Sequence, residues 1–198
     1  QKLALEECEV DIVTCPSGRI QRLINAAKAT IEGIEIETRI NITDQFSIQG
    51  SLGYTDAGFD EFLGFDADGV RGYDPVTDPA AAAALKFERV PELTYNIMAN
   101  YFQPLSNGAE IDFRLAYSYT DDFTNDALGT RAIITDSYGL LDASVSYTFA
   151  GSGLKLTVFG KNITDEDYHD FALDNALTSL TWGGVPDTYG LRLTYSFE

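Results

Sequence analysis

The sequence predicts an all-β fold, an antiparallel up-and-down sheet of about seven strands. The first observation is that apolar and polar residues alternate with period two along most of the chain, as in half-buried strands and not in helices. The second is composition, because 12 Phe, 11 Tyr and 17 Gly among 198 residues suit strands and turns and exclude disorder. The third is that short and long links alternate between the predicted strands.

Seven stretches carry the alternation. They cover residues 34–42, 46–55, 93–101, 111–120, 141–149, 154–159 and 189–197. Most reach nine residues, close to the roughly 9–11 residues with which a tilted strand crosses a bilayer. No run approaches 18 apolar residues, so no transmembrane helix is expected.

The links differ at the two ends of the predicted sheet. Short turns rich in Gly, Asn, Asp and Ser fall near 43–45, 105–109 and 150–153, whereas long links fall near 57–89, 121–135 and 165–187. Outer-membrane barrels have this asymmetry, with short periplasmic turns and long extracellular loops. The long links hold most of the net charge of −18, which predicts a solvated acidic rim and argues against a nucleic-acid partner.

The alternation alone does not say which face meets water. In 141–149, Leu141, Val145 and Tyr147 share one face, and Asp142, Ser144 and Ser146 the other. Strand length, tyrosines near the strand ends and the polar second face favour a transmembrane barrel with a wet lumen. We therefore expect the first three side chains to face lipid. The alternative is a soluble barrel whose apolar face points inward and binds a small apolar ligand.

Four short motifs follow one another over nearly the whole chain. They are Asn25 to Glu35 with its Gly33-Ile-Glu35 ending, Pro91-Glu-Leu-Thr-Tyr-Asn96, Gly160-Lys-Asn162-Ile-Thr-Asp165-Glu-Asp-Tyr168, and Gly183-Gly-Val-Pro186 before the final stretch. Together they resemble TonB-dependent outer-membrane receptors. The chain departs from that pattern at Asp187, where the family often has arginine, and at Glu198, which follows the usual terminal aromatic residue.

The resemblance implies a plugged barrel of about 22 strands. Residues 1–198 would be its C-terminal segment, with the plug domain and the earlier strands absent. It further implies a non-enzymatic receptor in the outer membrane of a Gram-negative bacterium, taking up a scarce nutrient such as a ferric siderophore. The expected partners are outer-membrane lipid, the remaining strands and plug, the inner-membrane TonB complex through the missing N-terminal part, and the extracellular nutrient. A passive pore or adhesion barrel without a plug is the alternative within this class.

Candidate site residues come from three places, and no catalytic, cofactor-binding or metal-binding residue is among them. Cys8 and Cys15 are close enough to close a small loop disulfide, with two free thiols or a metal half-site as the alternatives. The resemblance makes the aromatic and histidine side chains of the long links candidates for ligand contact, and the candidates are Trp182, His169 and Tyr73; packing of one loop against another is the alternative for the aromatic rings. The resemblance assigns barrel assembly to the apolar side chains of the closing strand, which are Tyr189, Leu191, Leu193, Tyr195 and Phe197.

Two Asn-Ile-Thr sequences, at Asn41 and Asn162, match acceptors for N-glycosylation. Both lie at predicted strand ends of a bacterial protein, so we expect neither to carry a glycan. Asp66-Ala-Asp68-Gly69 matches the start of a calcium loop, but its twelfth position is Thr77 instead of the glutamate that such a loop requires.

Overall fold

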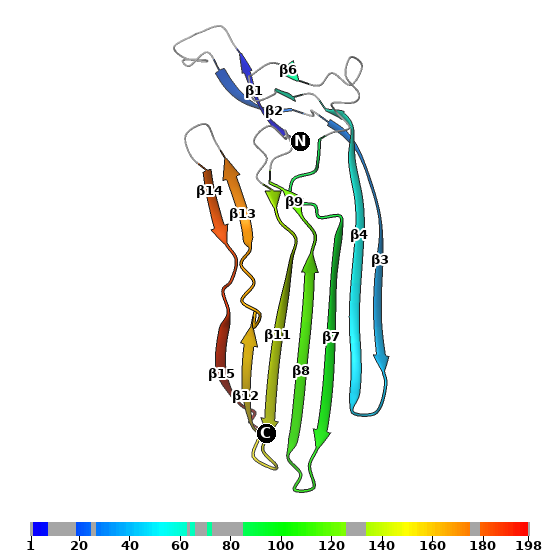
Figure 1. The fold of residues 1–198 in the computed structure, drawn as a ribbon, viewed down its shortest axis with the longest axis vertical. Coiled ribbons are helices and arrows are strands. Elements are labelled where there is room, and N and C mark those ends of the chain that lie inside the picture. Colours follow the sequence, from blue (N-terminus) through cyan, green and yellow to red (C-terminus); the bar gives the residue numbers. More distant parts are fainter. Residues whose placement is uncertain are drawn as a thin grey trace.

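Seven long strands form one antiparallel sheet in the computed structural model (Figure 1). The structure describes residues 2–7, 19–24, 27–62, 64–65, 71–72, 85–125, 134–174 and 179–197. The wall strands are β3 (Ala27–Asn41), β4 (Phe46–Phe62), β7 (Leu93–Pro104), β8 (Glu110–Thr120), β11 (Tyr138–Thr148), β12 (Leu154–Lys161) and β15 (Thr188–Tyr195). They lie side by side in chain order, which confirms the predicted up-and-down sheet.

The register of the wall places apolar side chains opposite apolar ones. Val145 on β11 lies opposite Phe113 on β8 and Val158 on β12, and Val158 in turn lies opposite Leu191 on β15. Such cross-strand pairs stabilise a sheet and fix its register, because a slip by one residue would turn every side chain to the other face. The sheet therefore has one apolar face and one polar face across its whole width.

The three short turns are held by local hydrogen bonds. At the first turn, the Thr43 hydroxyl accepts from the backbone N–H groups of Gln45 and Phe46 at 3.2 and 3.0 Å. At the second, Gly108 adopts a φ of 80° and donates its N–H to the Leu105 carbonyl at 3.0 Å. A left-handed backbone of this kind favours glycine, so these links close tightly, as predicted.

At the opposite end the structure differs from the prediction of long irregular links. β3 and β4 extend the wall to residues 27 and 62, and each long link contains small ladders of its own. The described strands there are β5 (Gly64–Phe65), β6 (Arg71–Gly72), β9 (Phe123–Thr124), β10 (Ile134–Thr135), β13 (His169–Asp174) and β14 (Ser179–Gly183). A further hairpin, β1 (Lys2–Glu7) with β2 (Arg19–Ile24), precedes the wall.

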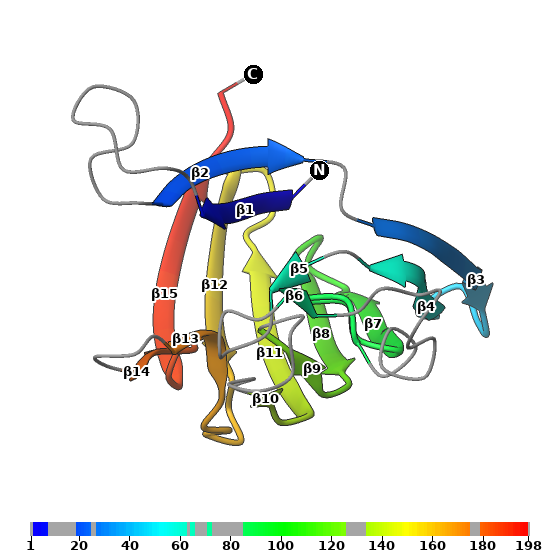
Figure 2. The same cartoon turned by 90° about the horizontal axis from the view of Figure 1, so that it is seen from above.

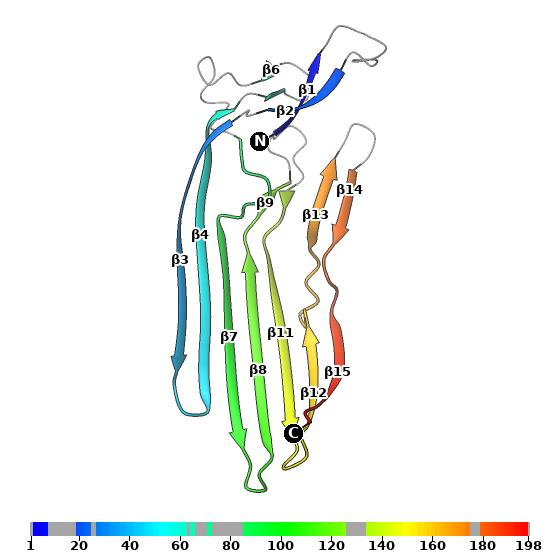
Figure 3. The same ribbon diagram turned by 180° about the vertical axis from the view of Figure 1, so that it is seen from behind.

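The sheet curves and stays open. Seen from above, its strands follow an arc that ends at β3 on one side and β15 on the other, and the view from behind shows the same unpaired margins (Figures 2 and 3). Only Leu85, Ala109, Phe123 and Ala172 are buried apolar residues in the described ranges. Within those ranges there is no helix long and apolar enough to span a membrane. In the described ranges, the wall is thus a single curved layer without a packed core on either face.

Candidate functional site

The apolar face of the wall is exposed over its full height. Val145 and Val158 lie in the middle strands of the sheet, yet 42% and 52% of their surfaces are exposed. Leu191 on β15 reaches 74%. Exposed apolar patches of this extent are rare on soluble proteins and mark an interaction or membrane surface. This face is the candidate lipid-contacting surface.

Aromatic rings mark both ends of that face. Toward the long links, the ring of Tyr95 stacks on Tyr119 with centroids 5.0 Å apart, and near the short turns Tyr101 lies 6.2 Å from Phe113. Tyr54 lies two residue pairs beyond Tyr95 in the ladder of β4 and β7, and it is eight residues from Phe46, which pairs with Tyr101. Eight residues span about 27 Å along a strand, or about 20 Å of height at a tilt of 35–45°. This height approaches the roughly 25 Å apolar band of outer-membrane barrels, which aromatic girdles flank.

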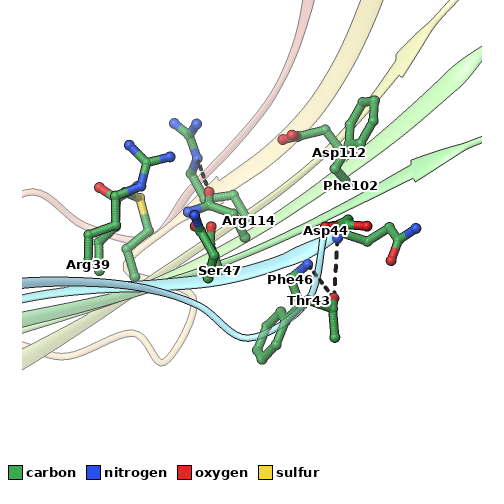
Figure 4. Close-up of a pocket in the computed structure, with 13 residues that line it drawn as sticks. Arg39, Thr43, Asp44, Phe46, Ser47, Phe102, Asp112 and Arg114 are labelled. Atoms are coloured by element: carbon green, nitrogen blue, oxygen red, sulfur yellow. Dashed lines mark hydrogen bonds between the residues drawn. The ribbon is translucent and has the colours of Figure 1, made fainter.

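The other face is polar and hollowed. One hollow of about 530 Å³ lies beside the first short turn, and a second of about 320 Å³ lies between β8, β11, β12 and β15. Asp142 and Ser144 line the second hollow, on the face that the alternation predicted for them. Figure 4 shows Arg39 and Arg114 on one side of the sheet at the first hollow, and Phe46 on the opposite side. The predicted division of the strands into two faces is confirmed, while contact with lipid stays a prediction.

Two of the three predicted ligand-contact residues lie on one hairpin, β13–β14, which we call the outer hairpin because it lies at the end of the wall opposite the short turns (Figure 1). His169 pairs with Gly183 at the base of the hairpin, and Trp182 pairs with Phe171 two residues further along β13. Both His169 and Trp182 are exposed, and the rings of Trp182 and Phe171 lie 5.2 Å apart. The hairpin thus brings an indole and an imidazole to the outer end of the wall. Tyr73 lies outside the described residues.

Arg89 positions this hairpin, and no motif in the sequence singles this residue out. Its guanidinium lies 5.4 Å from the centre of the Phe171 ring and donates to the Asp170 carbonyl at 3.4 Å. Its own N–H donates to the Thr124 carbonyl at 2.8 Å, and its backbone adopts a φ of 58°. Arg89 therefore joins the segment before β7 to both β9 and β13. In the sequence, Arg89 stands out only as a basic residue within a strongly acidic link.

The motif that begins at Gly160 forms a joint between three strands. Asn162 is 3% exposed, and its Nδ2 donates to the carbonyls of Glu166 and Val185 at 2.9 and 3.2 Å. Its Oδ1 accepts from the Glu166 N–H, and its N–H donates to the Asp142 carboxylate, both at 2.9 Å. Tyr168 completes the joint by packing its ring over Gly184, where any Cβ would overlap it. A buried, fully bonded Asn162 amide is inaccessible to glycosylation, in line with the expectation.

The closing strand presents its apolar residues on one face, as predicted. Tyr189, Leu191, Leu193 and Tyr195 are all more than half exposed, and Phe197 follows β15 with 89% of its surface exposed. One edge of β15 pairs with β12, and its other edge has no neighbour within the described sheet. Its role in barrel assembly stays a prediction. Cys8 and Cys15 lie outside the described residues, so their pairing also stays a prediction.

A family comparison matches most of the chain. Residues 9–163 match the family model described as "TonB dependent receptor-like, beta-barrel". The match covers β2 to β12 and therefore includes six of the seven wall strands and the links near 57–89 and 121–135, whereas the link near 165–187 and β15 lie outside it.

Three solved structures resemble this fold. The ferric yersiniabactin uptake receptor FyuA from Yersinia pestis superposes with a TM-score of 0.70 at 19% identity over 88% of this chain and 24% of that one. The siderophore receptor PiuA from Acinetobacter baumannii superposes with a TM-score of 0.67 at 16% identity, over 90% of this chain and 22% of that one. The ferric-catecholate import receptor Fiu from E. coli K12 superposes with a TM-score of 0.61 at 19% identity, over 96% of this chain and 22% of that one. The chain thus spans about a quarter of the length of the structures it matches.

Proposed function

Since the chain belongs to the family of TonB-dependent receptor β-barrels, we propose that it forms part of the wall and outer loops of a receptor that imports a scarce nutrient across the outer membrane. Members of this family are receptors and transporters and not enzymes, which confirms the prediction of a non-enzymatic protein. A ferric siderophore is the nutrient class we propose, with support from three neighbours that are named as siderophore or ferric-catecholate receptors.

The observation that carries the proposal is the exposed apolar face between two aromatic bands. In a soluble barrel the large apolar side chains fill the interior, whereas here they cover the face opposite the polar hollows. Burying that face in hydrocarbon removes its contact with water without any packed core. This argues against the soluble-barrel alternative and supports a place in the outer membrane of a Gram-negative bacterium.

The open sheet supports a further part of the proposal, that residues 1–198 are the C-terminal segment of a larger barrel. Unpaired backbone groups are costly in hydrocarbon, so spanning sheets must close. The free edges of β3 and β15 would then pair with strands from the rest of the polypeptide. A plug domain in the same polypeptide would fill the lumen and connect the receptor to the inner-membrane TonB complex.

Uptake measurements test this function in cells that carry the full-length gene or its deletion. We expect iron-55 from one class of ferric siderophore (catecholate, phenolate or hydroxamate) to accumulate only with the gene present. Accumulation should stop when TonB is deleted or a protonophore collapses the inner-membrane potential. Uptake that persists under both treatments would identify the plug-free pore instead, and absence of the protein from the outer-membrane fraction would reject both.

A further inference from the structure

The outer hairpin is attached to the rest of the molecule mainly by side chains. Its two strands pair with each other, and no backbone ladder joins them to another described strand. At its base, the Gly184 N–H donates to the Tyr168 carbonyl at 2.7 Å. Above the base, Ala172 is 1% exposed where β13 lies against β10, and the guanidinium of Arg89 lies over the ring of Phe171. The direction in which the hairpin points therefore depends on a few side-chain contacts.

A β-bulge at Asp170 lies at the base of this hairpin. His169 pairs with Gly183 and Phe171 pairs with Trp182, so Asp170 has no partner residue in the ladder with β14. A bulge bends its strand and interrupts the pairing of the backbone. The Asp170 carbonyl accepts from the Arg89 guanidinium at 3.4 Å. Arg89 thus supplies a donor at the residue where the ladder supplies none.

Arginine is suited to this position because its planar group can meet a ring and a carbonyl together. The Arg89 guanidinium lies 5.4 Å from the centre of the Phe171 ring and donates to the carbonyl of the preceding residue. A guanidinium stacks on aromatic rings and presents its N–H donors in a rigid fork, whereas a lysine ammonium is a compact charge on a flexible stem. Lysine would therefore hold the bulge less well than arginine.

The backbone of Arg89 is itself held in place. Its φ of 58° lies in the left-handed region, which is unfavourable for arginine and persists only where the surroundings impose it. Its N–H donates at 2.8 Å to the carbonyl of Thr124 on β9, a residue that is 6% exposed. The exposed side chain of Arg89 therefore reaches the hairpin from a fixed point on β9.

We propose that Arg89 fixes the bend of the outer hairpin at the Asp170 bulge and is thereby a positioning residue for nutrient recognition. It acts through Trp182 and His169, which the hairpin carries, and does not itself touch the nutrient. This inference rests on the proposed function, because it takes these two side chains as part of the binding surface. Without the guanidinium the hairpin populates several directions, and the apparent affinity falls with the fraction of receptors that hold the competent one.

Native-state hydrogen exchange on the full-length receptor in detergent tests the bend. Arg89→Gly removes the side chain and accepts the positive φ, so the bond to Thr124 stays. We expect the amides of residues 169–172 to exchange roughly tenfold faster, the size of one exposed cation–π contact and one hydrogen bond together. Arg89→Lys should give an intermediate rate. Lys86→Gln is the matched control, because Lys86 is an exposed base of the same link and lines a separate hollow beside β4 and β9.

Phe171→Leu shows whether the contact itself is responsible. This substitution keeps an apolar side chain but removes the ring, so its effect on exchange should be at least threefold smaller when Arg89→Gly is already present. The bend is not set by Arg89 if the two effects are additive, if Lys86→Gln accelerates exchange equally, or if Arg89→Gly stays within twofold of the wild type. If Arg89→Gly fails to assemble, unchanged exchange in both Arg89→Lys and Phe171→Leu overturns the proposal.

Binding and uptake test the consequence for recognition. The probes are iron-55 complexes of a catecholate, a phenolate and a hydroxamate siderophore, titrated one at a time. We expect Arg89→Gly to raise the Kd and the half-saturating concentration of the transported complex about tenfold, with the maximal energised rate unchanged within twofold. Unchanged affinity despite faster exchange, or a lower maximal rate at unchanged affinity, rejects the positioning role. If the wild type imports none of the three complexes while the exchange results hold, the proposed function fails and the bend at Arg89 stands.

Discussion

Replacing Asn162 by alanine should loosen the joint between β12 and β15 selectively. The substitution removes three side-chain hydrogen bonds from a site that is 3% exposed. At about 1 kcal/mol each, the loss is about 3 kcal/mol. Alanine also tolerates the φ of 47° less well than asparagine, which adds about 1 kcal/mol. We therefore expect a local destabilisation of about 4 kcal/mol.

Native-state hydrogen exchange on the full-length receptor in detergent measures this loss where it occurs. The Glu166 amide donates to the Asn162 side chain, so its exchange should reflect opening of the joint. Since each 1.36 kcal/mol corresponds to a factor of ten, about 4 kcal/mol predicts roughly thousandfold faster exchange. The Asn162→Gly variant should recover about 1 kcal/mol of this, because glycine accepts a positive φ.

Asn41→Ala is the matched control for this experiment. Asn41 begins the other Asn-Ile-Thr sequence, is exposed, and has no side-chain hydrogen bond within the described ranges. Its replacement should leave exchange at Glu166 unchanged. If Asn162→Ala also changes that rate less than threefold, the hydrogen bonds of this joint contribute little and the reasoning from burial fails.

Three further predictions concern lipid, redox state and ligand. Val145→Arg should destabilise the receptor by about 2–4 kcal/mol if that position lies near the bilayer midplane, and Ser144→Arg much less; equal tolerance in folding titrations into liposomes would contradict the assigned faces. Peptide mass spectrometry without reductant should find Cys8 joined to Cys15, whereas complete alkylation of both thiols would exclude the disulfide. Trp182→Ala should weaken binding of the transported nutrient about tenfold at unchanged barrel yield, as expected for a lost aromatic contact of about 1.4 kcal/mol; unaltered affinity in a titration would remove this residue from the binding surface.

All seven wall strands were predictable because one face of each must be apolar. On β3 and β4 the apolar face ends before the strands do, so the predicted strands were too short there. Glu32 on β3 pairs with Asp56 on β4, on the same face as Ile34 and Tyr54. The backbone ladder continues past this pair, but the charges end the alternation on which the prediction depended. The end of the apolar face and the end of the strand are different boundaries, and the alternation reports only the first.

The hairpin β13–β14 and the contact between Arg89 and Phe171 were harder to predict, for a different reason. The hairpin β13–β14 carries a weak alternation of its own, with Phe171 and Leu173 opposite Trp182 and Leu180. A flanking run of acidic and glycine residues concealed it. The contact of Arg89 with Phe171 joins segments more than 80 residues apart, and no local pattern encodes such a contact. The family resemblance did identify Asn162, but only the structure shows that its role is to join strands.

The separate small ladders of the outer links have a consequence for how such receptors diversify. Each of β5–β6, β9–β10 and β13–β14 closes its backbone pairing within its own link, so none of them sets the register of the wall. Insertions, deletions or exchanges there would change these links while the ladder of the wall keeps its register. Grafting a foreign hairpin between β12 and β15 is accordingly a practical route to chimaeric receptors, provided that the graft keeps the ends anchored by Asn162 and Tyr168.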